Sequence, residues 1–247
     1  MVKLSLAYVA AIACASSAIV TPAASGDPRA VIELFTSQGC SSCPPADKLM
    51  GEFVADPSLV TISLPIDYWD YLGWKDTLAD PRHAARQRAY SAVRGDREVY
   101  TPQVVINGSM HAIGSNKGAI EKAIAKSREN PATLAVPVKA SVANGRLSIV
   151  LPDRSDLVVP AEVWIAGVAR VITVPIQRGE NRGKTISYHN VARRWIKVGK
   201  WQGRAESWSI PLRDVASEGV DSATVFLQAG TVEKPATVLG AVSAMLH

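Results

Sequence analysis

Two cysteines, Cys40 and Cys43, constrain the fold more than any other feature of the sequence. Before them, residues 31–37 (VIELFTS) form a short apolar run rich in β-forming side chains, which predicts a buried strand. After them come Pro44 and Pro45, which suit the first turn of a helix, and then apolar side chains at helical spacing. The sequence therefore predicts a strand, a Cys-Ser-Ser-Cys loop and a helix in direct succession.

This placement of the cysteine pair favours thiol chemistry. A thiolate is the nucleophile in disulfide exchange, and a helix N-terminus offers unpaired N–H groups and a partial positive charge. In such motifs the pKa of the thiol falls from about 8.5 to roughly 3.5–7. We therefore expect Cys40 to be the attacking group and Cys43 to resolve the mixed disulfide.

The start of the chain has the composition of a secretory signal peptide. A single lysine precedes an apolar stretch, and small residues follow it. We predict a signal peptide over residues 1–25, a periplasmic or secreted location, and no stable membrane span after removal of the leader; an uncleaved N-terminal anchor is the alternative. The third cysteine, Cys14, would be lost with the leader, which leaves one cysteine pair in a compartment where disulfides form.

Strand and helix signals alternate as far as Asn130-Pro131, a sequence typical of a domain boundary. We therefore predict an α/β domain over residues 26–131. Beyond the cysteine loop its expected elements are a helix at 46–54, a strand at 59–66, a helix at 81–93, a strand at 103–107, a hairpin turn at Asn107-Gly108 and a helix at 116–128.

Residues 132–247 carry a different pattern. Apolar residues alternate with other residues on both sides of Asn144-Gly145, which predicts a β-hairpin. Further short β-rich runs follow without helical segments between them, and strands at such spacing indicate an antiparallel sandwich. We therefore predict a second, all-β domain over residues 132–247.

Four motifs together resemble a secreted bacterial thioredoxin-like family of unassigned function: VIELFTSQGCSSCPPAD, DYWDYLGWKDTLADP, YTPQVVING and QRGENRGK. The resemblance covers nearly all of the chain after the leader. It implies a periplasmic or secreted protein with a redox role. The expected fold class is an α/β thioredoxin-like N-terminal domain plus an all-β sandwich-like C-terminal domain.

The same resemblance assigns a role to Thr101 and Pro102. In the thioredoxin fold a cis proline after threonine faces the cysteine pair and positions the backbone of the incoming peptide. Two departures stand out: Gly39 replaces the usual tryptophan before the first cysteine, and Leu34 takes the place of the buried acid that manages proton transfer. Glu33 is adjacent, but strand alternation points it to the other face.

Two hypotheses for function follow from the cysteine pair. The first is an exported thiol–disulfide oxidoreductase that acts on thiols or disulfides of exported proteins and needs no cofactor beyond the Cys40–Cys43 disulfide. The second is a non-catalytic thioredoxin-like binding protein in which the pair is a structural disulfide or binds copper. Tetrahedral zinc would need further ligands, and the histidines are scattered, so no metal site is predicted. Whether the pair oxidises or reduces its partners stays open.

The aromatic segment at residues 67–76 (DYWDYLGWKD) supplies candidates for a substrate lip. Tyr68, Trp69 and Trp74 would bury apolar area against an unfolded peptide at low entropic cost. The alternative is a local hydrophobic cluster that anchors a long loop.

The formal net charge of +5 is compatible with an anionic partner but selects none. A basic and aromatic stretch, residues 193–201, is typical of the solvated face of a strand, and binding of an anionic polymer or a membrane surface is the alternative. No nucleotide-binding fingerprint is present in the sequence. We expect no nucleic-acid partner, and the oligomeric state stays open.

Overall fold

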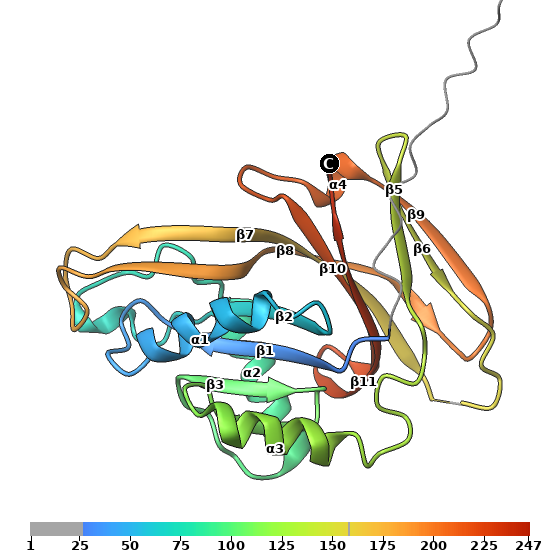
Figure 1. Cartoon of the computed structure of the whole chain (residues 1–247), viewed down its shortest axis with the longest axis horizontal. Coiled ribbons are helices and arrows are strands. Elements are labelled where there is room, and N and C mark those ends of the chain that lie inside the picture. Colours follow the sequence, from blue (N-terminus) through green and yellow to red (C-terminus); the bar gives the residue numbers. More distant parts are fainter. Residues whose placement is uncertain (1–26, 158) are drawn as a thin grey trace, which may run out of the picture.

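The computed structural model describes residues 27–157 and 159–247 (Figure 1). The predicted leader, with Cys14, lies outside the described residues. The first half contains β1 (Ala30–Thr36), α1 (Pro44–Val54), β2 (Leu59–Pro65), the short 3-10 helix η1 (Asp70–Leu72), α2 (Pro81–Arg94), β3 (Gln103–Ile106), β4 (Met110–Ile113) and α3 (Lys117–Ser127). The second half contains β5 (Lys139–Ala143), β6 (Arg146–Leu151), β7 (Ala161–Pro175), β8 (Thr185–Trp201), β9 (Glu206–Pro211), α4 (Leu212–Val215), β10 (Ser222–Thr231) and β11 (Lys234–Met245).

Strands from both halves form one mixed sheet of eight strands, in the order β11-β10-β7-β8-β2-β1-β3-β4. The two halves join where β2 pairs in parallel with β8, at Ser63 and Val191. The predicted fold class, an α/β thioredoxin-like domain plus a separate all-β sandwich-like domain, is therefore wrong. The boundary between residues 131 and 132 stays a prediction.

Side chains at the β2–β8 junction fix the two halves together. Ser63 Oγ donates to the carbonyl of His189 at 2.7 Å, and Asn190 Nδ2 donates to Thr61 Oγ1 at 2.9 Å. One buried cluster also takes members from both halves, among them Phe35 of β1 and Phe226 of β10. Burial of this shared apolar surface makes the sheet one unit of packing rather than two.

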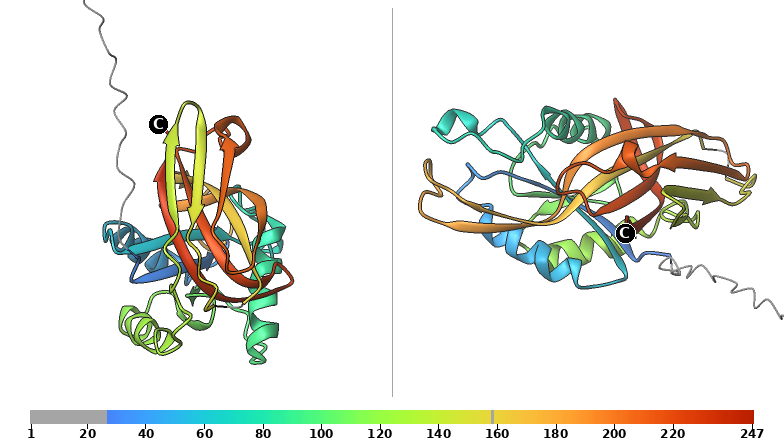
Figure 2. Two further views of the ribbon diagram at one scale, coloured as in Figure 1. Left: turned by 90° about the vertical axis from the view of Figure 1, so that its right-hand side faces the viewer. Right: turned by 90° about the horizontal axis from the view of Figure 1, so that it is seen from above.

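Alternation along β1 divides the helices between the two faces of the sheet. Ile32 and Leu34 pack in the cluster that contains side chains of α1 and α3, whereas Val31 and Phe35 pack in the cluster that contains side chains of α2. Figure 2 shows α1 and α3 on one side of the sheet and α2 on the other. Glu33 lies on the α2 face, as strand alternation predicts.

A second sheet, in the order β5-β6-β9, packs against the β7, β10 and β11 end of the large sheet. Its β5–β6 hairpin turns at Asn144 and Gly145, where φ is 52° and 71°. Positive φ at both central residues is what a tight hairpin turn needs, so the predicted hairpin is present. Leu147 and Ile149 of β6 are completely buried in the cluster between the sheets.

No helix within residues 27–157 and 159–247 is both long and apolar enough to cross a membrane.

Candidate functional site

Cys40 and Cys43 form a disulfide in the loop between β1 and α1, with 5.4 Å between their Cα atoms. Cys40 is 4% exposed and Cys43 is fully buried, while Ser41 and Ser42 between them are exposed. Cys40 is thus the cysteine that an incoming molecule can reach first.

Gly39, the residue before the disulfide, lies close against the aromatic segment. A Cβ atom on Gly39 would lie 3.1 Å from Cβ of Trp69 and 3.2 Å from its carbonyl oxygen. Such a distance is tighter than ordinary side-chain contacts. The close approach of Trp69 favours glycine at this position.

The structure brings Thr101 to the disulfide across 61 residues of sequence. The Thr101–Pro102 peptide bond is cis, and Cys40 Sγ lies 3.8 Å from the carbonyl oxygen of Thr101. Trp69 Nε1 donates to Thr101 Oγ1 at 2.7 Å, which fixes the threonine between the aromatic segment and the cysteine. The first cysteine and the Thr-Pro pair therefore form one local site.

The predicted lip residues are anchored around this site. Tyr68 donates its hydroxyl to Gln87 at 3.1 Å, and Trp74 Nε1 donates to Gln38 Oε1 at 2.7 Å. Trp69 stacks against Tyr71, which is 75% exposed. Tyr71 is thus the most accessible ring of the segment, and the other rings hold the loop in place.

The turn between β7 and β8 completes the cysteine loop from the far half of the chain. Figure 1 shows this hairpin reaching the carboxyl end of β1. Asn181 is fully buried, and its Nδ2 donates to the carbonyls of Gln38 at 2.9 Å and Cys40 at 2.8 Å. Lys184 Nζ donates in turn to Asn181 Oδ1 at 2.8 Å. The QRGENRGK motif therefore clamps the backbone on either side of Gly39, a role that no local sequence signal indicated.

The neighbouring residue of the same turn places a negative charge beside the disulfide. The backbone N–H of Ser41 donates to Glu180 Oε2 at 3.2 Å. The Ser41 amide is thus bonded to the Glu180 carboxylate and is not free to bond to a thiolate on Cys40. The charge of this carboxylate also disfavours a second negative charge nearby.

The N-terminus of α1 supplies fewer unpaired amides than its place after the cysteine pair predicted. Pro44 and Pro45 occupy the first helical positions and have no N–H. The N–H groups of Ala46 and Asp47 both donate to the carbonyl of Cys43, at 2.8 and 3.1 Å. Stabilisation of a thiolate here rests on the helix dipole rather than on direct amide hydrogen bonds.

A buried acid lies one helical turn after Cys43. Asp47 is 2% exposed, and its Oδ1 accepts a hydrogen bond from Thr36 Oγ1 at 2.8 Å. Within the described residues its Oδ2 has no hydrogen-bond partner, and burial raises the pKa of the carboxyl group to about 8. No feature of the sequence predicted this buried acid on α1, and Leu34 of β1 carries no carboxyl group.

Two further buried groups surround Asp47. Asp76 accepts from the backbone N–H groups of Gln38 and Leu78, both at 2.8 Å, and burial raises its pKa to about 6. The Tyr188 hydroxyl is buried without a hydrogen-bond partner among the described residues, and burial, followed by the charges of Asp47 and Asp76, raises its pKa. At neutral pH Asp47 and Tyr188 therefore keep their protons, whereas Asp76, with a pKa of about 6, is mostly ionised.

No group of three or more His, Cys, Asp or Glu side chains suited to hold a metal ion occurs in the parts of the chain that the structure describes.

Comparison with solved structures identifies two similar chains. Protein AGR_C_4864 from Agrobacterium tumefaciens is 31% identical, with a TM-score of 0.80 and coverage of 90% of this chain and 96% of that one. HBP35 of Porphyromonas gingivalis is 13% identical, with a TM-score of 0.61 and coverage of 90% and 76%, a likeness in fold alone. No curated protein matches the sequence. Residues 31–228 match the family DUF1223, described as a protein of unknown function, and since the match covers most of the chain, the protein belongs to this family.

Proposed function

We propose that the protein is an exported thiol–disulfide oxidoreductase that acts on protein partners through Cys40 and Cys43. The observation that carries the proposal is the 3.8 Å approach of Cys40 Sγ to the Thr101 carbonyl, because an exchanging sulfur needs a backbone surface beside it on which a peptide can align. The resemblance of the sequence motifs to thioredoxin-like proteins supports this chemistry for the site. The proposal includes cleavage of the leader and a periplasmic or secreted location.

In the oxidised protein the reaction begins at the more accessible sulfur. A partner thiolate attacks Cys40 Sγ and forms a mixed disulfide, while the Cys40–Cys43 bond breaks and Cys43 leaves as a thiolate. A second partner thiolate then attacks the partner sulfur of the mixed disulfide and releases Cys40. The partner gains a disulfide and the protein gains two thiols; the reverse sequence reduces a partner.

Asp47 supports the proposal as a source of the proton that Cys43 needs. Positions four apart on a helix share one face, so the carboxyl group of Asp47 follows the sulfur of Cys43 along the same side of α1. With a pKa of about 8, Asp47 is mostly protonated at neutral pH and can donate to the Cys43 thiolate as it leaves. In the reverse direction the carboxylate accepts the proton back.

Partner binding would use the surfaces next to Cys40. We propose that Thr101 and Pro102 align the partner backbone and that the aromatic segment at Tyr68, Trp69 and Trp74 contacts its side chains. No diffusible cofactor is part of this mechanism.

The test is a comparison of two single variants in an exchange assay with a reduced peptide dithiol. Cys40→Ser is expected to abolish exchange, because it removes the sulfur that the partner attacks. Cys43→Ser keeps Cys40 as a thiol, so it is tested with the oxidised form of the same peptide. Cys40 is expected to attack the peptide disulfide and to remain in a mixed disulfide that gel electrophoresis without reductant detects, because no Cys43 is present to release it. Exchange that persists at the wild-type rate in Cys40→Ser overturns the proposal.

A second function is favoured by the low exposure of the disulfide. Cys40 is only 4% exposed and its loop is clamped by Asn181, as expected for a structural disulfide in a binding protein. A reduction potential below about −300 mV, together with no exchange, would support this candidate over the oxidoreductase. Stoichiometric copper bound to the reduced protein would instead assign the pair to metal binding.

A further inference from the structure

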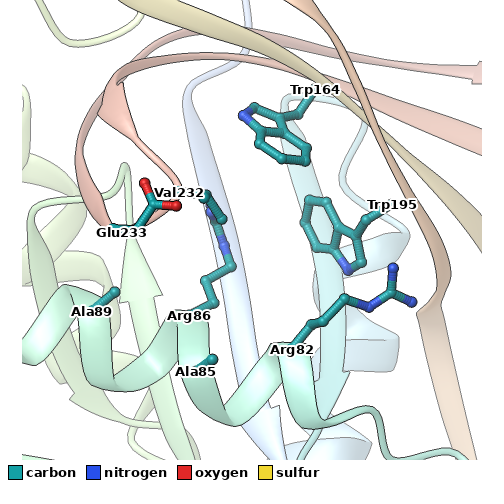
Figure 3. A pocket seen from close by; sticks show the side chains of 8 residues that line it. All are labelled: Arg82, Ala85, Arg86, Ala89, Trp164, Trp195, Val232 and Glu233. Atoms are coloured by element: carbon teal, nitrogen blue, oxygen red, sulfur yellow. The ribbon is translucent and has the colours of Figure 1, made fainter.

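A cavity of about 440 Å³ lies between helix α2, strands β7 and β8, and the turn that joins β10 to β11 (Figure 3). No residue that lines it belongs to the cysteine loop or to α1. Its volume falls in the range of about 300–1,000 Å³ that small-molecule sites occupy. The cavity is therefore large enough for a ligand and separate from the disulfide chemistry.

One wall of the cavity consists of two indole rings, from Trp164 of β7 and Trp195 of β8. Trp195 stacks on Phe226 with 5.9 Å between ring centroids, and its Nε1 donates to His83 Nε2 at 3.2 Å. Trp164 Nε1 donates to Glu162 Oε2 at 3.0 Å. Both indole N–H groups are thus satisfied within the protein, so the rings are held in place before any ligand arrives.

The opposite wall is open because its side chains are small. Ala85 and Ala89 lie four residues apart on α2 and so on one face of that helix. Figure 3 shows both methyl groups on the cavity side of the helix, across from the indoles. A larger residue at either position would occupy the space between the helix and the rings.

The two arginine side chains that line the cavity are already paired with carboxylates of the protein. Arg86 Nε donates to Glu33 Oε2 at 2.6 Å, and Arg82 Nε donates to both carboxylate oxygens of Asp80 at 2.9 and 3.0 Å. A ligand that carries a negative charge would gain little from these guanidinium groups, because their charges are compensated. The lining therefore suits a neutral ligand.

Glu233 supplies a hydrogen-bond acceptor at the mouth of the cavity. Its Oε2 accepts from Thr231 Oγ1 at 2.8 Å, and its carboxylate has a second oxygen to offer. Figure 3 places Glu233 across the cavity from the two indoles. A ligand held against the rings can thus direct a donor group towards this carboxylate.

We propose that this cavity binds a neutral, planar aromatic molecule that carries an N–H or O–H donor. The ring packs between the indoles of Trp164 and Trp195 and the methyl groups of Ala85 and Ala89, and the donor bonds to Glu233. Flat aromatic rings match preformed indole walls in offset or edge-to-face contact. The proposal stands independently of the thiol–disulfide function.

The probe is indole, titrated into protein whose tryptophans are labelled with ¹⁵N. The chain has six tryptophans, and their indole N–H signals are assigned with Trp→Phe variants. Saturable shifts at Trp164 and Trp195, with a dissociation constant below about 1 mM and with Trp69 and Trp74 unmoved, support the site. No saturable shift, or shifts confined to Trp69 and Trp74, overturns it.

Two alanine positions on α2 provide a matched pair of variants. Ala89→Leu fills the cavity and is expected to weaken indole binding at least about tenfold. Ala92→Leu adds the same side chain at an exposed position outside the cavity and is expected to leave affinity unchanged. Equal affinity in the two variants overturns the placement of the ligand.

The ligand chemistry is tested with two further probes. 1-Methylindole lacks the donor and is expected to bind about three- to tenfold more weakly than indole, a difference that Glu233→Leu should remove. An aliphatic alcohol of ten carbons tests an acyl chain as the occupant, and binding as tight as that of indole overturns the aromatic assignment.

Discussion

Replacement of Asn181 by alanine tests the clamp between the β7–β8 turn and the cysteine loop. The Asn181 side chain is fully buried and donates to the carbonyls of Gln38 and Cys40. The Cys40 carbonyl keeps the N–H of Cys43 as a donor at 3.2 Å, so the main cost falls on the Gln38 carbonyl. A buried acceptor that loses its donor costs about 1–3 kcal/mol, and the second lost bond adds about 0.5–1.5 kcal/mol.

We therefore expect Asn181→Ala to lower the free energy of unfolding by about 1.5–4.5 kcal/mol, the sum of the two costs. The assay is urea unfolding of the oxidised protein, where this loss moves the midpoint down by about 1 M. Arg182→Ala, an exposed change in the same turn, is the matched control and should stay within about 0.5 kcal/mol of the wild type. Indistinguishable midpoints for the two variants would refute the role assigned to the Asn181 amide.

Three other substitutions probe the charges. Glu180→Gln keeps an acceptor for the backbone but removes a negative charge, so iodoacetamide should alkylate Cys40 in the reduced protein about two- to fivefold faster at pH 7; an unchanged or slower rate would contradict this. Asp47, with a pKa raised from 3.8 to about 8, binds its proton more tightly in the folded state, so the stability it contributes declines as pH rises from about 4 to 8. Asp47→Asn should flatten that decline in unfolding experiments at pH 5 and pH 8, and an equal decline in both proteins would exclude the burial argument. Glu33→Gln leaves the Arg86 guanidinium buried without its carboxylate and should lower the free energy of unfolding by about 3–5 kcal/mol. The double variant Glu33→Met with Arg86→Met removes both charges and should regain most of this stability.

The local elements around the cysteine pair could be predicted from the sequence because their signals are local. The apolar run before Cys40 is β1, and the prolines after Cys43 begin α1. The Asn144-Gly145 turn likewise carries its own conformational preference, and the hairpin lies there. Each of these depends on residues within a few positions of one another.

The sheet could not be predicted in the same way. β7 and β8 are long strands whose pairing shifts register between Val163 and Trp164 and again between Gly167 and Val168. Such irregularities interrupt the side-chain alternation, so each strand resembles two shorter ones in the sequence. The pairing of Ser63 with Val191 has no local signal, and it is the contact that turns two expected domains into one sheet.

Two residues of the candidate site were missed for related reasons. Asn181 acts through a side-chain amide on backbone carbonyls 141 and 143 residues earlier, a relation that spacing does not reveal. Asp47 belongs to the CPPAD motif, but the sequence of the helix does not reveal its raised pKa, because that shift follows from burial against β1.

The distance in sequence between Asn181 and Cys40 determines the order in which the parts of the site are synthesised. The chain emerges from the ribosome from its N-terminus, so the cysteine pair is made well before the residue that holds its backbone. Until the β7–β8 turn has been made, the loop that carries the two sulfurs has neither the Asn181 amide nor the Glu180 carboxylate of that turn. The disulfide reaches its final surroundings only when the β7–β8 turn has been translated and has docked. The site is therefore completed late in the folding of each new chain.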